Sequence, residues 1–403
     1  MKHLLKAALL VCVVALFLSA LSLSTAGAKA SSSFWKVYQG RYSLNAGTPT
    51  ATFPGGHALN GVAAVSASDV WAVGNSLTKT FQSPKLLIEH WNGKQWSMVK
   101  SPNPGSFENS LNNVAVVTAN DVWAVGEFSN SSSSSQTLFE HWNGKSWSVV
   151  KSPTPAGSTS IFLGGLAVVS ASDIWAVGSS SNSSSSSQTL IEHWNGKDWS
   201  IVTSPNRGSQ DSLGSIASVT ANDIWAVGSS SNNSSSSQTL TEHWNGSTWS
   251  IVTSPSPGSG VVGLNGVTVV STNNVWAVGT NNTNGTTLIE HWNGSSWSVV
   301  TSPNPGQINL LLGVAAVSGT DIWAVGQSLA ANGNVLIAYW NGSTWSGATS
   351  PDAPGSVNNF LAGISVISAT DIWAVGVYQS NNIAAHPLTE HWNGSTWSVV
   401  PSP

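Results

Sequence analysis

Six adjacent glutamate–histidine pairs recur along the chain, and their carboxylate and imidazole groups are well suited to bind a metal ion or to exchange protons. The two members of a pair are neighbours in a short apolar segment typical of a β-strand, so they point to opposite faces and cannot converge on one ion. We therefore predict that the pairs are structural and that no metal is bound. The pairs are Glu89–His90, Glu140–His141, Glu192–His193, Glu242–His243, Glu290–His291 and Glu390–His391.

An aspartate opens the apolar segment before most of these pairs, and in the third copy the three residues are Asp173, Glu192 and His193. Partly buried groups of this kind are usually hydrogen-bonded to one another, which predicts supports between strands. The fifth copy has Asn274 in place of the aspartate, and the sixth has alanine and tyrosine in place of the pair. A cooperative metal ring would not tolerate such changes, whereas a redundant set of supports would. Metal binding or catalysis at these residues is the alternative.

Few other side chains are available for catalysis. No two of the remaining carboxylates can be assigned as the facing pair that a glycosidase needs, and there is no G-x-S-x-G nucleophile motif. The serine-rich stretches 179–187 and 229–237 indicate flexible polar linkers. We therefore predict a protein that is not an enzyme, with no catalytic residue and no cofactor. The remaining carboxylates are Glu108, Glu127, Asp198, Asp211 and Asp352.

Two tryptophan-containing strings position these residues. The string D-[VI]-W-A-V-G, with asparagine for aspartate in one copy, occurs seven times after about residue 57, and each copy is followed by E-H-W-N-G-x-x-W-S or a close variant. Each repeat therefore has three tryptophans, which in the third copy are Trp175, Trp194 and Trp199. Repeats of about 50 residues are typical of propellers and solenoids.

Each repeat contains four short apolar segments separated by turn residues, which predicts four antiparallel strands. Asn245-Gly246 predicts a two-residue type I′ hairpin between the last two strands of the fourth repeat. We therefore predict an all-β protein, a seven-bladed β-propeller of four-stranded antiparallel blades over residues 57–403, with a solenoid as the alternative. The strands expected in the fourth repeat are Leu213–Val219, Ile224–Gly228, Leu240–Trp244 and Thr248–Val252.

The repeat resembles the kelch repeat of galactose-oxidase-like propellers. The resemblance rests on Asp223–Gly228, Leu240–Trp244, Trp249 and Ser254-Pro255, and it extends over residues 57–403. One glycine stands where the kelch pattern has a pair, and the arginine often found near the inner strand is absent. The resemblance implies the propeller fold. It implies no activity, because the copper site of that family needs a cysteine, and the only cysteine here is Cys12.

The connections between strands divide into two kinds, and variable loops on a rigid frame are where binding residues usually lie. The connections within each hairpin string are short and nearly identical, whereas those between the second and third strands and between repeats are long and variable. Among the loops between the second and third strands, those of repeats 1, 6 and 7 differ most. Aromatic and polar side chains suited to sugars predict a ligand site there, with ordinary loop residues as the alternative. The candidate ligand-binding residues on these loops are Phe81, Lys85, Tyr378, Gln379 and His386, and on the loops between repeats they are Phe107, Phe162 and Arg207.

The N-terminus predicts secretion. Lys2 and Lys6 precede an apolar run that ends near the cleavage site Ala28-Lys29-Ala30, which indicates a signal peptide over residues 1–30, with a retained membrane anchor as the alternative. Residues 31–56 form a lead-in with one candidate extra strand, Phe34–Tyr38, which competes with Ser395–Val400 for the outer edge of the last blade. We expect the C-terminal segment to take that edge.

Charged residues make up only 7% of the chain, and the net charge is −4, which argues against nucleic-acid binding. We therefore predict a secreted, monomeric binding or adhesion protein without a membrane span after signal removal. Its expected partner is a glycan or a cell-surface protein. A polysaccharide-active hydrolase or lyase and a structural envelope protein are the alternatives.

Overall fold

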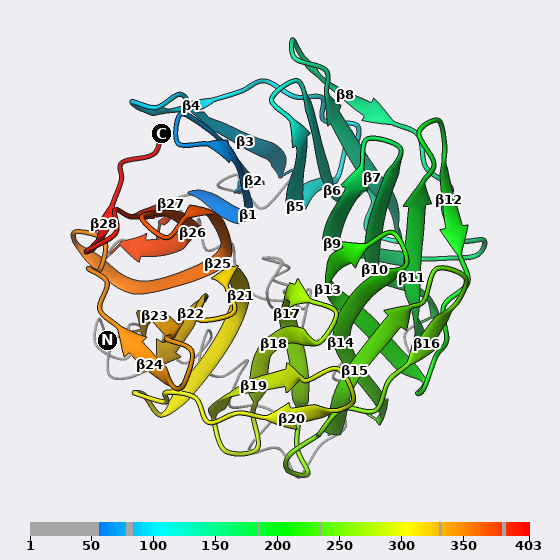
Figure 1. The fold of residues 1–403 in the computed structure, drawn as a ribbon. Helices are drawn as coiled ribbons and strands as arrows, with labels where there is room; N and C mark the ends of the chain where they lie inside the picture. Colours follow the sequence, from blue (N-terminus) through cyan, green and yellow to red (C-terminus); the bar gives the residue numbers. More distant parts are fainter. Residues whose placement is uncertain (1–55, 78–83, 184–185, 234–235, 330–332, 381–383) are drawn as a thin grey trace, which may run out of the picture.

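The computed structural model describes residues 56–77, 84–183, 186–233, 236–329, 333–380 and 384–403, and the predicted signal peptide, the Phe34–Tyr38 segment and Phe81 lie outside these ranges. All regular structure within them is β-strand, as the composition predicted. Figure 1 shows the strands β1 to β28 arranged around a central axis. The chain is an all-β protein of the β-propeller type.

The strands follow one another from the centre outwards, and each pairs antiparallel with the next within successive groups of four, here called repeats 1 to 7. The innermost strands are β1 (Gly56–Ser66), β5 (Glu108–Thr118), β9 (Ser160–Ser170), β13 (Gln210–Thr220), β17 (Val262–Ser271), β21 (Ile308–Ser318) and β25 (Ser356–Ser368). The second strands are β2 (Asp69–Leu77), β6 (Asp121–Ser131), β10 (Asp173–Ser183), β14 (Asp223–Asn233), β18 (Asn274–Asn281), β22 (Asp321–Leu329) and β26 (Asp371–Ser380).

The outer half of each sheet has a longer third strand and a short edge strand. The third strands are β3 (Lys85–Trp91), β7 (Ser134–Trp142), β11 (Ser186–Trp194), β15 (Ser236–Trp244), β19 (Thr286–Trp292), β23 (Gly333–Trp340) and β27 (Ala385–Trp392). The edge strands are β4 (Trp96–Met98), β8 (Trp147–Val150), β12 (Trp199–Val202), β16 (Trp249–Ile251), β20 (Trp297–Val299), β24 (Trp345–Ala348) and β28 (Trp397–Val399).

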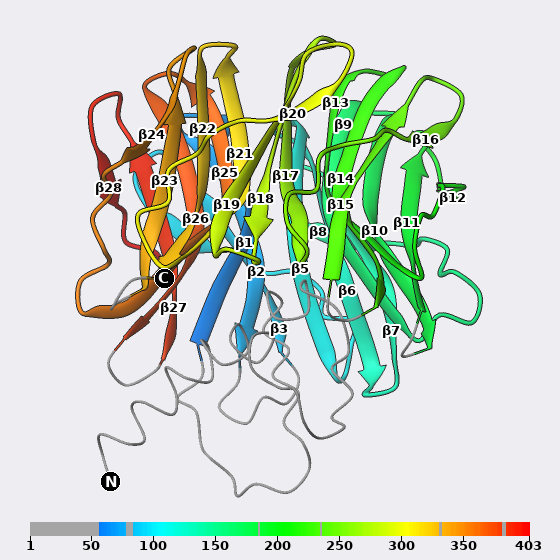
Figure 2. The same cartoon turned by 90° about the horizontal axis from the view of Figure 1, so that it is seen from below.

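The up-and-down order of the strands gives the molecule two different ends, and Figure 2 shows the strands running between them. One end, here called the turn face, has the connections between first and second strands and between third and fourth strands. The other end, here called the loop face, has the connections between second and third strands and between repeats.

The Asn-Gly turns on the turn face are longer than expected. Trp194 pairs with Trp199 across four intervening residues, so the predicted two-residue hairpin is wrong. The Asn195 side chain explains the difference, because its Oδ1 accepts the backbone N–H groups of Lys197 at 3.0 Å and Asp198 at 2.9 Å. Gly196 has a φ of +91°, a left-handed conformation that glycine adopts without strain.

The serine-rich stretches on the loop face are extensions of the strands, so the prediction of flexible linkers is wrong for their described residues. Ser179 pairs with Thr189, and Ser181 pairs with Ser187, in a continuation of the β10–β11 ladder. Serine composition concealed this pairing, because strand pairing depends on backbone hydrogen bonds that serine does not prevent.

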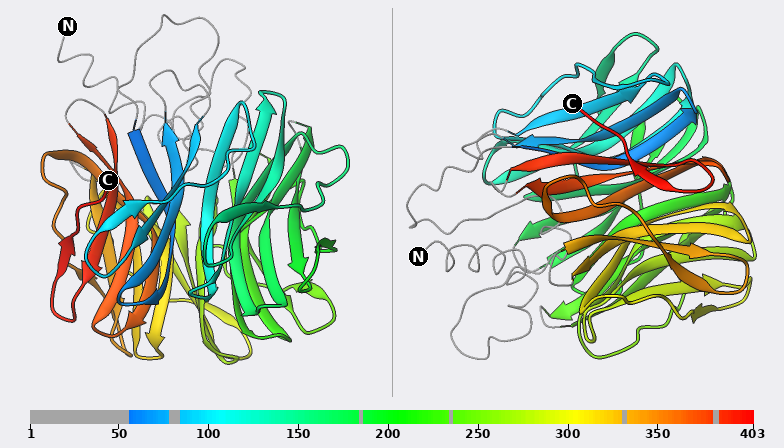
Figure 3. Two further views of the ribbon diagram at one scale, coloured as in Figure 1. Left: turned by 90° about the horizontal axis from the view of Figure 1, so that it is seen from above. Right: turned by 90° about the vertical axis from the view of Figure 1, so that its left-hand side faces the viewer.

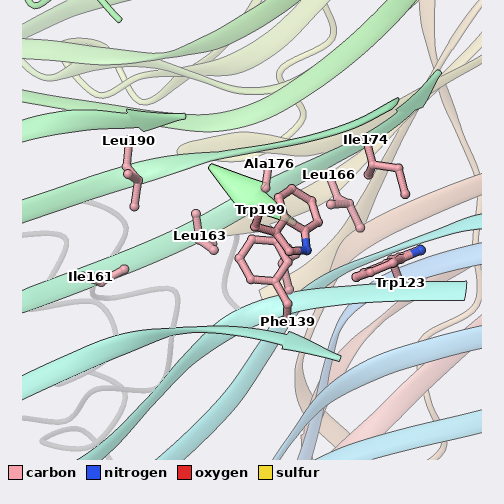
Figure 4. Close-up of a cluster of buried hydrophobic side chains, with 10 residues drawn as sticks. Trp123, Phe139, Ile161, Leu163, Leu166, Ile174, Ala176, Leu190 and Trp199 are labelled. Atoms are coloured by element: carbon pink, nitrogen blue, oxygen red, sulfur yellow. The ribbon is translucent and has the colours of Figure 1, made fainter. Parts of the chain in front are cut away.

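Tryptophan rings fill the contacts between neighbouring repeats. Trp123 of β6 lies 4.9 Å from Trp194 and 5.7 Å from Trp199 of the next repeat, measured between ring centroids. Figure 4 shows this cluster, where the Phe139 ring packs on Trp199 at 4.0 Å. The same three-tryptophan contact recurs at the other junctions between successive repeats and at the junction between the last repeat and the first, so 21 tryptophans serve this packing.

The first and last repeats meet through the same contact. Trp373 of β26 lies 4.9 Å from Trp91 and 5.3 Å from Trp96, and Figure 3 shows the blue and red sheets side by side. The C-terminal segment supplies the edge strand β28 of the last repeat, as expected. The sheets therefore form a closed ring.

The glycine that ends the string D-[VI]-W-A-V-G is required by a close approach of two strands. A Cβ on Gly228 would lie 1.9 Å from the carbonyl oxygen of Ser212, because the innermost strand has a β-bulge between Leu213 and Ser215 at this point. The same approach occurs in every repeat, which explains why one glycine is kept where the second strand passes the bulge.

Candidate functional site

Asp, His and Trp side chains form one compact unit near the turn face in repeats 1, 2, 3, 4 and 7. In repeat 3, His193 Nε2 lies 2.9 Å from Asp173 Oδ1, which also accepts the Trp175 Nε1–H group at 2.7 Å. The His193 ring stacks on Trp175 with centroids 4.2 Å apart. Trp175 in turn packs against the next repeat, so the unit orients an inter-repeat tryptophan.

This unit recurs with substitutions that keep its packing. In repeat 5, Asn274 Oδ1 takes the place of the aspartate oxygen, 2.9 Å from His291 Nε2. In repeat 6, Tyr339 takes the place of histidine and packs on Trp323 with ring centroids 4.5 Å apart and planes tilted by 41°. An amide and a phenol preserve the contacts but would not bind a metal ion in the same way, which favours the structural interpretation.

The glutamate of each pair points away from its histidine, towards the preceding repeat. Glu192 is fully buried, and its Oε2 accepts the hydroxyl of Ser152 from repeat 2 at 2.6 Å. Burial raises the pKa of Glu192 to about 8, so this carboxyl is largely protonated at neutral pH. Within the described ranges, no group of three or more His, Cys, Asp or Glu side chains is arranged to hold a metal ion.

The serines that bond these glutamates were missed at the sequence level. Ser402 donates to Glu89 Oε2 at 2.5 Å and so joins the C-terminal end to repeat 1. A signal was present, since Ser-Pro follows the edge strand of every repeat. The serines hydrogen-bonded to a glutamate of the next repeat around the ring are Ser152, Ser350 and Ser402.

Part of the predicted ligand site comes together in repeat 7. The rings of Tyr378 and His386 stack with centroids 4.9 Å apart and planes 20° apart, and both side chains are half-buried. His386 Nε2 lies 3.2 Å from Ser380 Oγ. Gln379 follows Tyr378 on β26 and therefore points to the opposite face of the sheet, with its Oε1 3.5 Å from Asn358 Nδ2. We call Tyr378 and His386 the repeat-7 cluster.

The structure adds His57 to this region. Burial, together with the charge of His386, lowers the pKa of His57, so its imidazole is neutral at neutral pH. Gly56 pairs with Ala385 across the junction between repeats 1 and 7, which brings the two histidines near each other. The sequence signal was a histidine at the position where Asn109 and Asn309 bond the preceding loop.

The other predicted site residues do not join this cluster. Lys85 is exposed at the start of β3. Phe107 is 47% exposed before repeat 2, and Phe162 in repeat 3 lines the central channel. Arg207 is exposed, and its backbone N–H donates to the carboxylate of Asp211 at 2.5 Å. These aromatic and cationic residues are therefore distributed around the ring.

The central channel contains a cavity with a volume of about 240 Å³. Asparagines at the bulges of three innermost strands line it. The Asn60 side chain donates to the carbonyl of Leu111 at 2.8 Å, and the Asn112 side chain donates to that of Leu163 at 2.8 Å. These amide donors are used between repeats, which assigns the asparagines a role in ring closure.

Solved structures place the chain among the β-propellers. Ulvan lyase, a polysaccharide lyase, matches with a TM-score of 0.54 and 10% identity over 87% of this chain and 97% of that one. YCF48 bound to a D1 peptide matches with a TM-score of 0.51 and 15% identity over 81% and 92%. YCF48 from Cyanidioschyzon merolae matches with a TM-score of 0.50 and 14% identity over 80% of this chain and 94% of that one. No family model matches the sequence, and no curated protein matches it.

The prediction that the chain is not an enzyme is wrong, because the comparisons do not allow an enzymatic function to be excluded. Ulvan lyase is an enzyme with this fold, and the absence of a carboxylate pair excludes only glycosidases that use such a pair. At these identities the likeness shows the propeller fold alone. Across the described residues, no helix is long and apolar enough to cross a membrane.

Proposed function

We propose that the chain is a secreted propeller that binds a glycan through its loop face, at the repeat-7 cluster. The stacked Tyr378–His386 pair is the observation that carries this proposal. A half-buried aromatic pair offers an apolar surface for a sugar ring, and the Tyr378 hydroxyl can donate and accept hydrogen bonds with sugar hydroxyls. A cell-surface protein that presents such a glycan is the expected partner.

The finer architecture forms part of the proposal. We infer seven blades, one from each of repeats 1 to 7, because each repeat has the same four strands and the same tryptophan contacts with both neighbours. The kelch-like character of the repeat, secretion after residue 30, a lead-in over residues 31–56 and a monomeric propeller over residues 57–403 are proposed on the sequence motifs.

Polysaccharide cleavage at the same face is the second candidate function. Its support is His57, because a neutral imidazole can remove a proton from a sugar ring, and its lowered pKa favours that form. Product formation from a panel of acidic and neutral polysaccharides tests this candidate. Activity that is lost in His57→Ala but kept in Ser180→Ala would favour cleavage.

A glycan array with the purified chain tests binding. For a ligand found there, Tyr378→Ala should weaken binding by about 1–3 kcal/mol, as expected for the loss of one aromatic anchor. Ser180→Ala is the matched control, because Ser180 occupies the same position of the second strand in repeat 3, and we expect it to leave binding unchanged. Equal losses from both variants would replace the repeat-7 cluster with a site shared by all repeats.

A further inference from the structure

The charges of this protein are distributed unevenly between its interior and its surface. The formal net charge is −4, but seven glutamates are fully buried, namely the six of the Glu-His pairs and Glu127. Burial raises the pKa of Glu140, Glu192, Glu242 and Glu290 to about 8, and that of Glu89 and Glu390 to about 7. Asp198 and Asp352 are the exposed carboxylates among the described residues. The net negative charge therefore does not describe the surface.

The exposed cations lie in the first half of the ring. The sequence has no lysine or arginine after Arg207, so repeats 5 to 7 have none. The described cations, all exposed, are Lys85, Lys94, Lys100, Lys145, Lys151, Lys197 and Arg207.

Most of these cations follow the outer edge of repeats 1 to 3. Three of them occupy the third position of the Asn-Gly turn, where repeats 4 to 7 have serine. Two more follow the edge strands of repeats 1 and 2. We call Lys94, Lys100, Lys145, Lys151 and Lys197 the lysine rim.

The lysine rim also presents one exposed apolar side chain in each edge strand. Met98 is 51% exposed, Val149 is 42% exposed and Ile201 is 43% exposed. In repeats 1 and 2 this side chain lies in sequence between two rim lysines. The only close acidic neighbour of a rim lysine in the described ion pairs is Asp198, 3.9 Å from Lys197, and both side chains are more than 70% exposed. Such an exposed pair leaves the lysine available.

We propose that the lysine rim binds an anionic polysaccharide, a sulfated or uronic-acid chain that runs along the outer edge of repeats 1 to 3. The cations stand on successive repeats of a convex edge, which suits a polymer with charges at intervals. The isolated Met98, Val149 and Ile201 side chains can contact the apolar faces of sugar rings between the charges.

Other anionic partners fit this edge less well. The edge-strand tryptophans Trp96, Trp147 and Trp199 are buried, so no described aromatic ring of those strands is available to stack on the bases of a single strand. The exposed apolar side chains are isolated and form no continuous patch for insertion into a lipid surface. This proposal does not depend on the repeat-7 cluster, which lies in a different repeat.

Binding of fluorescent heparin at several NaCl concentrations tests the proposal, with uncharged dextran, duplex DNA and phosphatidylglycerol vesicles as comparison probes. The double variant Lys94→Ser/Lys145→Ser should lower heparin affinity about fivefold per lysine and reduce the salt dependence. Folding should be unaffected, because Lys145→Ser recreates the Asn-Gly-Ser-Ser turn of repeat 5.

The matched control is Ser296→Asp/Thr344→Asp, which changes the net charge by the same amount in the turns of repeats 5 and 6 and copies the aspartate found at Asp198. We expect this control to bind heparin within about twofold of the parent chain at 0.15 M salt, because charges separated by more than the Debye length are screened. Equal losses in both double variants, or tighter binding of DNA or vesicles than of heparin, would overturn the proposal. Glycan binding at the repeat-7 cluster should be the same in all of these variants.

Discussion

The turn face and the loop face of this propeller are built from the same seven repeats but differ in how much the repeats vary. On the turn face, the Asp–His–Trp unit and the four-residue turn recur with few changes. On the loop face, repeats 3 and 4 have nearly identical serine-rich strands, while repeat 7 has Tyr378 and His386 at the equivalent level. A side chain on the turn face must fit against the next repeat, so few residue types are compatible with its position. Side chains on the loop face make fewer contacts of this kind, so their residue types can vary more.

The serine-rich strands show that the loop face also has structural parts. Ser237 Oγ donates to the carbonyl of Val262 at 2.7 Å and accepts its backbone N–H at 3.1 Å, which joins repeats 4 and 5. Ser135 makes the same two contacts with Ile161 of repeat 3. Residues that recur in many repeats, on either face, are therefore those that make contacts between repeats. Residues that differ between repeats are the positions at which a ligand-binding site can be built.

The largest expected effect of breaking this pattern is on the tryptophan contacts. Trp175→Ala removes a buried ring that packs against two tryptophans of repeat 4, and we expect it to lower the free energy of unfolding by about 3–5 kcal/mol. Denaturant unfolding measures the change. The exposed Phe107 is the control, and Phe107→Ala should change stability by less than about 0.5 kcal/mol. Similar values for the two variants would contradict the assignment of stability to the junctions.

A smaller loss of stability than that of Trp175→Ala is expected for substitution of the glycine where the second strand passes the β-bulge. Gly228→Ala places a methyl group 1.9 Å from the Ser212 carbonyl oxygen, and overpacking of this kind costs about 1–3 kcal/mol. Gly347→Ala is the control, because its Cβ would meet no atom within 4 Å. The two variants are compared by thermal unfolding, and equal midpoints would show that the bulge relaxes at no cost.

The Asp–His contact should contribute less to the free energy of unfolding than the tryptophan contacts or the glycine at the bulge, because both side chains are about one quarter exposed. His193→Ala should lower stability by about 1 kcal/mol, through loss of the stacking on Trp175 and of the hydrogen bond to Asp173. Elemental analysis of the purified chain should find no bound metal before or after the change. Stoichiometric zinc or copper that disappears in the variant would refute the structural interpretation of the Glu-His pairs.

The buried glutamates predict a gradual dependence of stability on pH. Their pKa values are about 7 to 8 in the folded chain, above the ordinary value of 4.5, so the folded state binds more protons than the unfolded state between these limits. The stabilisation that these glutamates contribute should therefore be complete below about pH 4.5 and should be lost as the pH rises to 8. Glu192→Gln should make the fall shallower. A thermal midpoint that rises from pH 5 to pH 8 in the parent and variant alike would contradict this.

The repetition of sequence strings predicted the strands and much of their order. Tryptophan spacing located the strands around Trp175, Trp194 and Trp199, and alternation correctly separated Glu192 from His193. Composition was misleading in the serine-rich segments, because strand pairing there depends on the backbone. The Asn195 turn was assigned the wrong length, because the capping role of its side chain cannot be read from the Asn-Gly pair alone.

The site was less predictable than the fold. The stacking of Tyr378 on His386 joins residues on two strands, a contact that the sequence strings do not specify. Phe107, Phe162 and Arg207 lie before or within the innermost strands of repeats 2, 3 and 4, so they are separated around the ring. The lysine rim was missed at the sequence level, because its meaning depends on knowing that most of the glutamates are buried. Tertiary packing determines which carboxylates are buried, and a count of charged residues in the sequence cannot show this.

A paired measurement of stability and glycan binding on Tyr378→Ala and His193→Ala tests the central claim most directly. The account predicts opposite outcomes: Tyr378→Ala loses about 1–3 kcal/mol of binding with little change in thermal midpoint, and His193→Ala loses stability but keeps binding at a temperature where it is folded. Loss of binding in the folded His193→Ala chain, with full binding by Tyr378→Ala, would place the functional site on the turn face and contradict the account.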